Sequence, residues 1–294
     1  MSKKWTILIV SLVIIVLFGI IIFSSFGYYK AEVYPLGEKR LLVRKIKNNN
    51  LLLNFLKPDA QSLITNGDLI IHKNPMVFDT KFSHKENYCS RVIGLPGDVI
   101  TIKESQVFVN DVAVNADYDI YFLFRVSSDE SQNFEKLLEP FNFEMIELLN
   151  NGKAANIITT TAEAEKMQEI EQIVNIRKIT KETDYNDPEM FCSKGNYFLW
   201  NKDNLGPLMV PQSEVTVFFN TRNIGIYKYL IQWHEDNQLE YDINKVSVNG
   251  QETDSYTIQQ DYYFVLNDNR YSRDDSRIWG FIPEDQIVGK VIKK

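Results

Sequence analysis

The segment from Trp5 to Tyr29 contains no charged residue and is rich in Ile, Leu, Val and Phe. An apolar stretch of this kind is long enough to cross the hydrocarbon core of a bilayer as one helix. We therefore expect residues 1–30 to form a single-pass anchor with a short cytoplasmic start. A cleaved signal peptide is the alternative, although Ser24-Ser25-Phe26-Gly27 matches a small-x-small cleavage site only loosely.

Composition narrows the class of the remaining body. The chain has 294 residues, is 44% hydrophobic and carries a net charge of −7, so it can build a packed core but offers no basic surface for nucleic acid. Cys89 and Cys192 lack metal-ligand spacing, and we expect two buried thiols, with one disulfide as the alternative. No sequence pattern points to a cofactor or a metal ion.

Short apolar runs bounded by turn residues indicate β-strands in most of the body. Asn110-Asp111 and Asn249-Gly250 are typical of tight hairpin turns, because these residue types tolerate a positive φ. One helix is expected around 224–234, where apolar residues fall on one face. The expected strands lie near 69–71, 92–94, 99–102, 107–114, 196–200, 262–266 and 287–292.

The pattern changes between residues 115 and 194. Apolar residues at helical spacing run from Phe134 to Leu149, with an interruption at Pro140. Thr160-Thr161-Ala162-Glu163 is typical of a capping box and predicts a helix that continues to about Ile173. A charged stretch from 180 to 188 then has the composition of a loop. We expect an inserted α+β lobe here.

Two blocks carry a family resemblance. Arg91-Val92-Ile93-Gly94-Leu95-Pro96-Gly97-Asp98, together with Asp268-Asn269-Arg270 and Asp275-Ser276-Arg277, resembles the signature motifs of signal peptidase I. Gly67-Asp68 resembles the strand that follows the nucleophile in that family. Trp200 to Leu208 is similar to a segment of the Bacteroidetes-type members, which also carry a central insertion.

The resemblance implies a mainly β fold: a signal peptidase I-like β-rich body at 31–114 and 195–294, the α+β lobe at 115–194, and the N-terminal transmembrane helix at 1–30. It places the body on the periplasmic or outer face of the inner (plasma) membrane. The activity that the resemblance implies is the family's, which is cleavage of signal peptides from secreted preproteins by a Ser/Lys dyad. The structural motif residues that it assigns are Gly67, Asp68, Arg91, Gly94, Pro96, Gly97, Asp98, Asp268, Asn269, Arg270, Asp275, Ser276 and Arg277.

The two residues of the dyad are replaced. By motif position, the nucleophilic serine corresponds to Asp59 and the basic lysine to Ser90. A serine hydroxyl needs a nearby base, and a lysine serves only when burial keeps its amine neutral. The family's supporting serine corresponds to Arg273, and Asn267 stands where the last motif usually begins with glycine.

We therefore expect a homologue without peptidase activity that binds signal peptides or preproteins, or regulates an active signal peptidase. An active endopeptidase with a rearranged site is the alternative, with Ser62 as the relocated nucleophile. A structural subunit of a membrane complex is the third possibility. His72, His84 and His234 have no nucleophile at motif spacing and are expected to be ordinary surface or helix-face residues.

Overall fold

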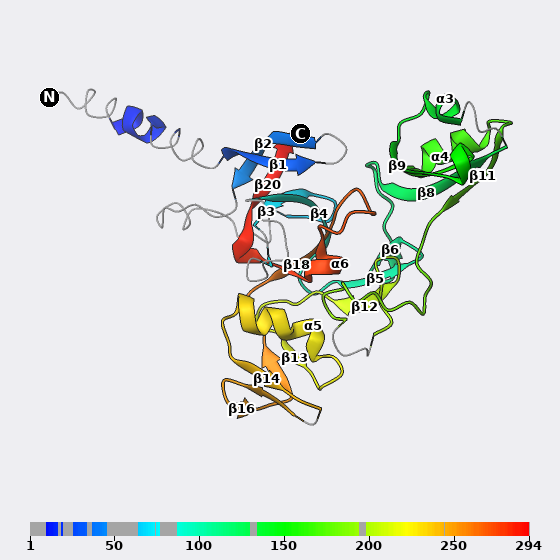
Figure 1. Ribbon diagram of the computed structural model, residues 1–294. Helices are drawn as coiled ribbons and strands as arrows, with labels where there is room; N and C mark the ends of the chain where they lie inside the picture. Colours follow the sequence, from blue (N-terminus) through cyan, green and yellow to red (C-terminus); the bar gives the residue numbers. More distant parts are fainter. Residues whose placement is uncertain are drawn as a thin grey trace. The chain divides into compact units, whose positions relative to one another are not determined.

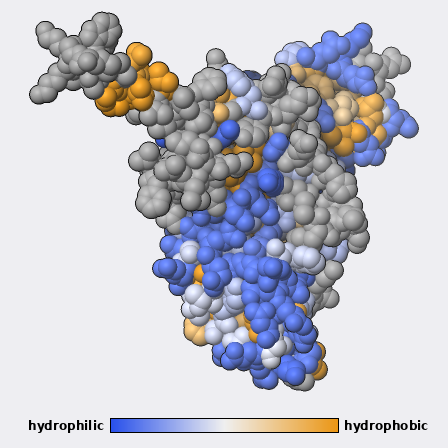
Figure 2. All heavy atoms as spheres, turned by 90° about the vertical axis from the view of Figure 1, so that its left-hand side faces the viewer, coloured by the Kyte–Doolittle hydropathy of each residue, from blue (hydrophilic) through white to orange (hydrophobic). Residues whose placement is uncertain are grey.

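A computed structural model describes residues 10–16, 19, 26–33, 37–45, 64–73, 75–76, 87–129, 134–193, 198–243 and 245–293. Residues 10–16 are helical, and their apolar side chains are exposed, as Figure 2 shows. Within the described ranges, no helix has both the length and the apolar character needed to span a bilayer. Most of the charge-free stretch lies outside those ranges, and a strand, β1, begins at Phe26.

The chain divides into two compact units, residues 1–92 with 285–294, and residues 93–284 (Figure 1). In the first unit, antiparallel strands pair in the order β1-β2-β20-β3-β4. Leu41, Val43 and Ile71 form a buried cluster on one face of this sheet. The strands are β1 (Phe26–Val33), β2 (Gly37–Lys45), β3 (Leu69–His72), β4 (Tyr88–Gly94) and β20 (Ile287–Lys293).

The second unit contains several small sheets and the strand β18, whose residues are all buried. A four-stranded sheet has the order β12-β5-β6-β7, a two-stranded sheet pairs β13 with β17, and a three-stranded sheet has the order β14-β15-β16. The elements are β5 (Val99–Lys103), β6 (Gln106–Val109), β7 (Val112–Ala113), β12 (Leu205–Met209), β13 (Thr216–Phe218), α5 (Ile224–Tyr229), the π-helical turn η3 (Leu230–His234), β14 (Leu239–Tyr241), β15 (Val246–Val248), β16 (Gln251–Glu252), β17 (Ser255–Thr257), β18 (Tyr262–Leu266), α6 (Ser276–Trp279) and β19 (Ile282–Pro283).

The same unit carries a lobe, drawn in green in Figure 1, whose four strands pair in the order β11-β8-β10-β9. Cross-strand pairs Phe124–Ile157 and Val126–Ala155 place apolar side chains on one face. Both lobe helices pack on that face and complete a core of their own. The lobe comprises β8 (Tyr121–Ser128), α3 (Phe134–Leu138), β9 (Glu144–Leu149), the 3₁₀ turn η2 (Asn150–Gly152), β10 (Ala154–Thr160), α4 (Thr161–Gln168) and β11 (Ile173–Lys178).

Most sequence expectations about the fold are confirmed. The protein is mainly β, and both predicted hairpin turns have positive φ, 51° and 63° at Asn110 and Asp111 and 51° and 78° at Asn249 and Gly250. Other expectations are wrong. Residues 144–149 form strand β9 rather than helix, because they pair with β10, and residues 198–200 form no strand.

The capping box is confirmed, since Thr160 Oγ1 accepts from the Glu163 amide at 3.2 Å. The helix, however, ends at Gln168 rather than near Ile173. Ile173 instead starts β11, which pairs with β8 and buries that side chain in the lobe core. Pairing with a strand far away in the sequence therefore overrides the local helical spacing.

Candidate functional site

Ser90, the residue expected from its motif at the family's base position, lies on β4 with its hydroxyl on the same sheet face as the imidazole of His72 on β3. The strand register pairs Ser90 with Ile70 and His72 with Tyr88, so Ser90 and His72 are diagonal neighbours on one face. Ser90 Oγ is 3.0 Å from His72 Nε2, and His72 Nδ1 is 2.7 Å from the carbonyl oxygen of Lys73. Because a carbonyl only accepts, Nδ1 carries the proton and Nε2 accepts from the serine.

Both side chains of this pair are sealed from solvent, with Ser90 1% and His72 0% exposed. Burial lowers the pKa of His72 to about 4, with an opposing upward effect from the Lys73 carbonyl. The ring is therefore neutral at physiological pH. His72 was expected to be an ordinary surface or helix-face histidine, which is wrong: the pairing of β3 with β4 buries it beside Ser90.

Cys89 faces the other side of β4, where it packs against the cluster of Leu41, Val43 and Ile71. Neighbouring residues of a strand point to opposite faces, so Cys89 does not share the face of Ser90. No disulfide joins the two cysteines; Cys192 is buried as expected, whereas Cys89 is only half-buried. Burial raises the pKa of Cys192 to about 12, so that thiol is protonated.

The Gly67-Asp68 motif holds the start of β3 in place. The Arg91 guanidinium donates to the Gly67 carbonyl at 2.6 Å, and Asp68 forms a 2.6 Å ion pair with Lys290. Asp68 also accepts from the amide and hydroxyl of Thr65 at 2.7 and 2.9 Å. These motif residues thus stabilise the backbone at the start of β3 and beside Ser90.

The segment from Gly94 to Asp98 is a tight turn. A Cβ on Gly94 would lie 2.7 Å from a side-chain atom of Ile100, and Gly97 has a φ of 88°, so both positions require glycine. Pro96 and Gly97 form the turn. Asp98 accepts from the Leu95 amide at 2.9 Å and from the Asn110 side chain at 2.8 Å, and these bonds close the turn.

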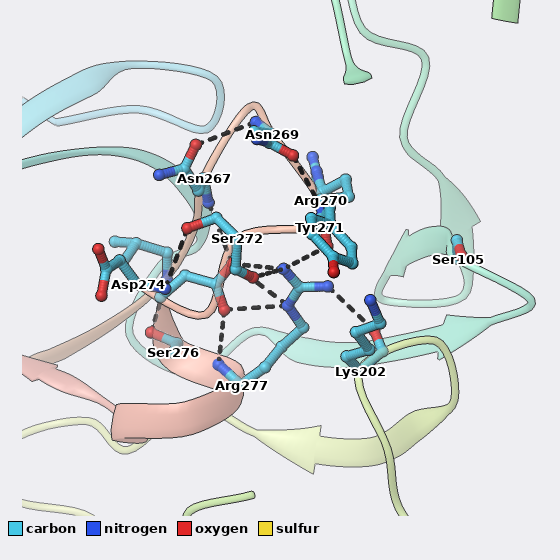
Figure 3. Close-up of polar contacts among 12 residues, drawn as sticks. Ser105, Lys202, Asn267, Asn269, Arg270, Tyr271, Ser272, Asp274, Ser276 and Arg277 are labelled. Atoms are coloured by element: carbon cyan, nitrogen blue, oxygen red, sulfur yellow. Dashed lines mark hydrogen bonds and ion pairs between the residues drawn. The ribbon is translucent and has the colours of Figure 1, made fainter. Parts of the chain in front are cut away.

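The last motif is organised by a buried ion pair, drawn in Figure 3. Arg277 Nη2 lies 2.6 Å from Asp275 Oδ2, with both side chains at most 2% exposed. The same guanidinium donates to the carbonyl oxygens of Lys202, Arg270 and Ser272 at 3.0 to 3.2 Å. Asp275 also caps α6 by accepting from the Arg277 amide, and Ser276 Oγ accepts from the amide of Val265 at 2.9 Å.

The remaining motif residues shape the loop before α6. Asn267 Oδ1 accepts from the Asn269 amide at 2.9 Å, and Asn269 Oδ1 accepts from the Tyr271 amide at 3.0 Å. The Asp268 carbonyl accepts from the Tyr121 amide at 2.9 Å, which joins the loop to the start of β8. Arg273, which the motif predicts at the supporting-serine position, forms an ion pair with Glu189.

Asp59, Ser62 and His84 lie outside the described residues. Within the ranges that are described, no cluster of three or more His, Cys, Asp or Glu side chains could hold a metal ion. The site that can be built is therefore the Ser90–His72 pair with its supporting motifs.

Comparison with known proteins agrees with these motifs. The family model described as "Signal peptidase, peptidase S26" matches residues 2–206 and 210–293. The chain belongs to this family. Signal peptidase I of Buchnera aphidicola subsp. Baizongia pistaciae is 23% identical over 261 residues, which cover 86% of this chain and 62% of that relative. Signal peptidase I of Haemophilus influenzae is 49% identical over 41 residues, 14% of this chain and 12% of the relative.

A solved structure of signal peptidase I from Enterococcus faecalis covers 78% of this chain and 96% of its own, at 15% identity and a TM-score of 0.30. The chain spans less than two thirds of the length of the two curated relatives described above. For this member of the signal peptidase family, the activity of these relatives is therefore a proposal.

Proposed function

We propose that this member of the signal peptidase family is anchored in the inner (plasma) membrane by residues 1–30, does not cleave peptides, and binds signal peptides or preproteins on the periplasmic or outer side. The observation that carries this proposal is the closed pair at the base position, where the buried Ser90 hydroxyl bonds a neutral His72. No amine is available at that position to activate a nucleophile.

The chemistry of the substitution supports the loss of activity. A Ser/Lys dyad needs a hydroxyl that loses its proton and an amine that accepts it, and this chain has Asp59 and Ser90 at those motif positions. Removal of a nucleophile or base from a serine protease lowers turnover on the order of a million-fold. A residual rate of that size would not process secreted proteins.

Retention of the surrounding scaffold supports a binding role. Gly67 remains held by Arg91, Asp68 by Lys290 and Asp275 by Arg277, although none of these contacts performs the proton transfer itself. Such contacts stabilise the backbone on which an extended peptide would lie. Binding is therefore the function that the scaffold can retain without the dyad.

A preprotein-cleavage assay on the full chain in detergent tests the proposal. The restored variant combines Asp59→Ser and Ser90→Lys with His72→Ala, because His72 fills the buried space that the longer side chain at position 90 would need. Asp59→Ser with His72→Ala is the matched control without the base. We expect cleavage only by the restored variant and binding of a signal-peptide C-region by the natural chain; specific cleavage by the natural chain would overturn the proposal.

An active endopeptidase with a rearranged site is the second candidate, and the 3.0 Å contact between Ser90 Oγ and His72 Nε2 favours it. A serine bonded to an imidazole that is oriented through its other nitrogen has the connectivity of a nucleophile and base. The full burial of both side chains argues against access by a substrate. This candidate predicts cleavage that Ser90→Ala or His72→Ala abolishes, or that Ser62→Ala abolishes if that residue is the relocated nucleophile.

A structural subunit of a membrane complex, or a regulator of an active signal peptidase, would give a different result on purification. A peptide binder recovers signal peptides or preproteins from detergent extracts. A structural subunit or regulator recovers stable protein partners in fixed proportion instead. Mass spectrometry of the co-purified material distinguishes the two outcomes.

A further inference from the structure

Arg270 is a buried arginine whose guanidinium forms no hydrogen bond or ion pair with any described residue. Its side chain is 6% exposed, and its Nε is buried without a partner. The side chain extends away from the Arg277 guanidinium (Figure 3), which forms the ion pair with the Asp275 carboxylate. The pKa of Arg270 is lowered to about 10, mainly by burial and secondly by the nearby positive charge of Arg277. The negative potentials of Tyr118, Asp275 and Asp268 oppose this shift only in part. A buried cation in this state is costly unless an anion pairs with it.

Arg270 lines a cavity of about 370 Å³ in the second unit, which we call the Arg270 pocket. The same cavity is lined by Thr160, Thr161 and Ala162, the cap and first turn of α4. The first turn of a helix leaves amide groups without helical partners and carries a partial positive charge. Of these amides, Thr160 Oγ1 accepts a hydrogen bond only from that of Glu163. Two independent positive features, a buried guanidinium and a helix N-terminus, therefore line one cavity.

We propose that the Arg270 pocket binds a carboxylate group, supplied by a small organic acid or by a peptide. A guanidinium presents parallel N–H donors that match the two oxygens of a carboxylate. An ion pair with a carboxylate would give the Arg270 Nε–H an acceptor and neutralise the buried charge. All residues that line this pocket belong to the second unit, and the proposal does not rest on the proposed function.

The charge of the pocket favours a monoanion. Asp119 also lines the cavity and is exposed to solvent, so it repels any anion that approaches from its side. One guanidinium balances one carboxylate, whereas a phosphate dianion would bring a second negative charge toward Asp119 in a chain with a net charge of −7. Tyr118 lines the same cavity.

The test is a titration of the full chain in detergent with acetate, with chloride replaced to hold ionic strength constant. The arginine Nε–H resonances are followed by NMR. We expect the Arg270 resonance to shift saturably, with a dissociation constant roughly in the millimolar range. Arg125, whose Nε already donates to Asn156 at 3.1 Å, is the internal control and should not move. Absence of a saturable shift at Arg270 would overturn the proposal.

Two variants separate binding from folding. Arg270→Gln should abolish the stabilisation of the chain by acetate in thermal unfolding, while Asp119→Asn, at an exposed position, should tighten acetate binding about threefold because it removes a repelling charge. Unchanged affinity in Asp119→Asn would place the anion elsewhere and overturn the proposal.

Three further probes define the ligand. Inorganic phosphate that binds more tightly than acetate would overturn the assignment to carboxylates. A short peptide with a free C-terminus that binds more tightly than its C-terminal amide indicates a peptide carboxylate, whereas equal binding of that free peptide and acetate indicates a small organic acid. None of these measurements involves cleavage or a signal peptide, so their failure and failure of the proposed function are distinguishable.

Discussion

At the scale of single residues, Ser90 and His72 form a satisfied buried polar pair. His72 reaches across from the neighbouring strand, and its ring accepts from the Ser90 hydroxyl. Buried polar groups are costly unless they are hydrogen-bonded. The buried Ser90 hydroxyl therefore depends on a second residue that no motif identifies.

His72 also predicts a dependence of stability on pH. Its pKa is lowered from 6.5 to about 4 in the folded protein, so the unfolded chain binds more protons between these values. The stabilisation from the neutral ring is complete above about pH 6.5 and is lost as the pH falls toward 4, by at most about 1.4 kcal/mol per pH unit.

We expect His72→Gln to flatten the fall in unfolding temperature between pH 7 and pH 4.5, since glutamine does not titrate. Thermal unfolding followed by circular dichroism measures this slope. His234→Gln is the comparison, because burial lowers the pKa of His234 to about 4 as well. Identical slopes in the natural chain and His72→Gln would show that this imidazole does not contribute.

Two arginines in the last motif predict contrasting effects on stability. Arg277→Gln leaves the buried Asp275 carboxylate without its partner and should lower the free energy of unfolding by about 3–5 kcal/mol. Arg273→Gln removes an exposed pair with Glu189 and should cost about 0–1 kcal/mol. Urea unfolding of both variants measures the difference, and equal losses would contradict the role assigned to the buried pair.

At the scale of elements, sequence signals hold where the interaction is local. The capping box at Thr160 and the turns at Asn110 and Asn249 depend on neighbouring residues, and each is found in the structure. Residues 144–149 form a strand rather than the predicted helix, because they pair with β10 after a turn. No local sequence pattern encodes that pairing. The strength of the cap is open to measurement.

Thr160→Ala should destabilise α4 by about 1 kcal/mol, because the Glu163 amide then loses its acceptor. Thr161→Ala is the matched control, since the same atoms are removed one residue later and Thr161 does not accept at the cap. Hydrogen exchange of the α4 amides provides the measurement. Equal exchange in both variants would mean that the cap does not stabilise the helix.

At the scale of the whole molecule, the lobe has its own buried core, with Phe124, Val126 and Ile157 on its sheet and Phe134 and Met167 on its helices. A sheet with helices on one face is a complete small layer architecture. We therefore expect the lobe to lose structure as a cooperative group.

Ile157→Ala should open a cavity in this core and cost about 2–5 kcal/mol, because the side chain is fully buried. Hydrogen exchange should rise across β8 to β11 and remain unchanged in β5 and β12. Val174→Ala, at a position 64% exposed, is the control and should leave exchange unaltered. Increased exchange in β5 as well would show that the lobe is not an independent unit.

The sequence alone determined the family, the mainly β class and the hairpin turns, because these depend on residue type and spacing along the chain. Only the tertiary structure revealed the Ser90–His72 pair and the buried Arg270, whose Nε has no partner among the described residues. Both arise from strands and loops that are distant in sequence and are brought together by pairing of β3 with β4 and of Tyr121 with the last motif. Burial and strand register are properties of the folded chain, so no local pattern could have shown what these side chains contact.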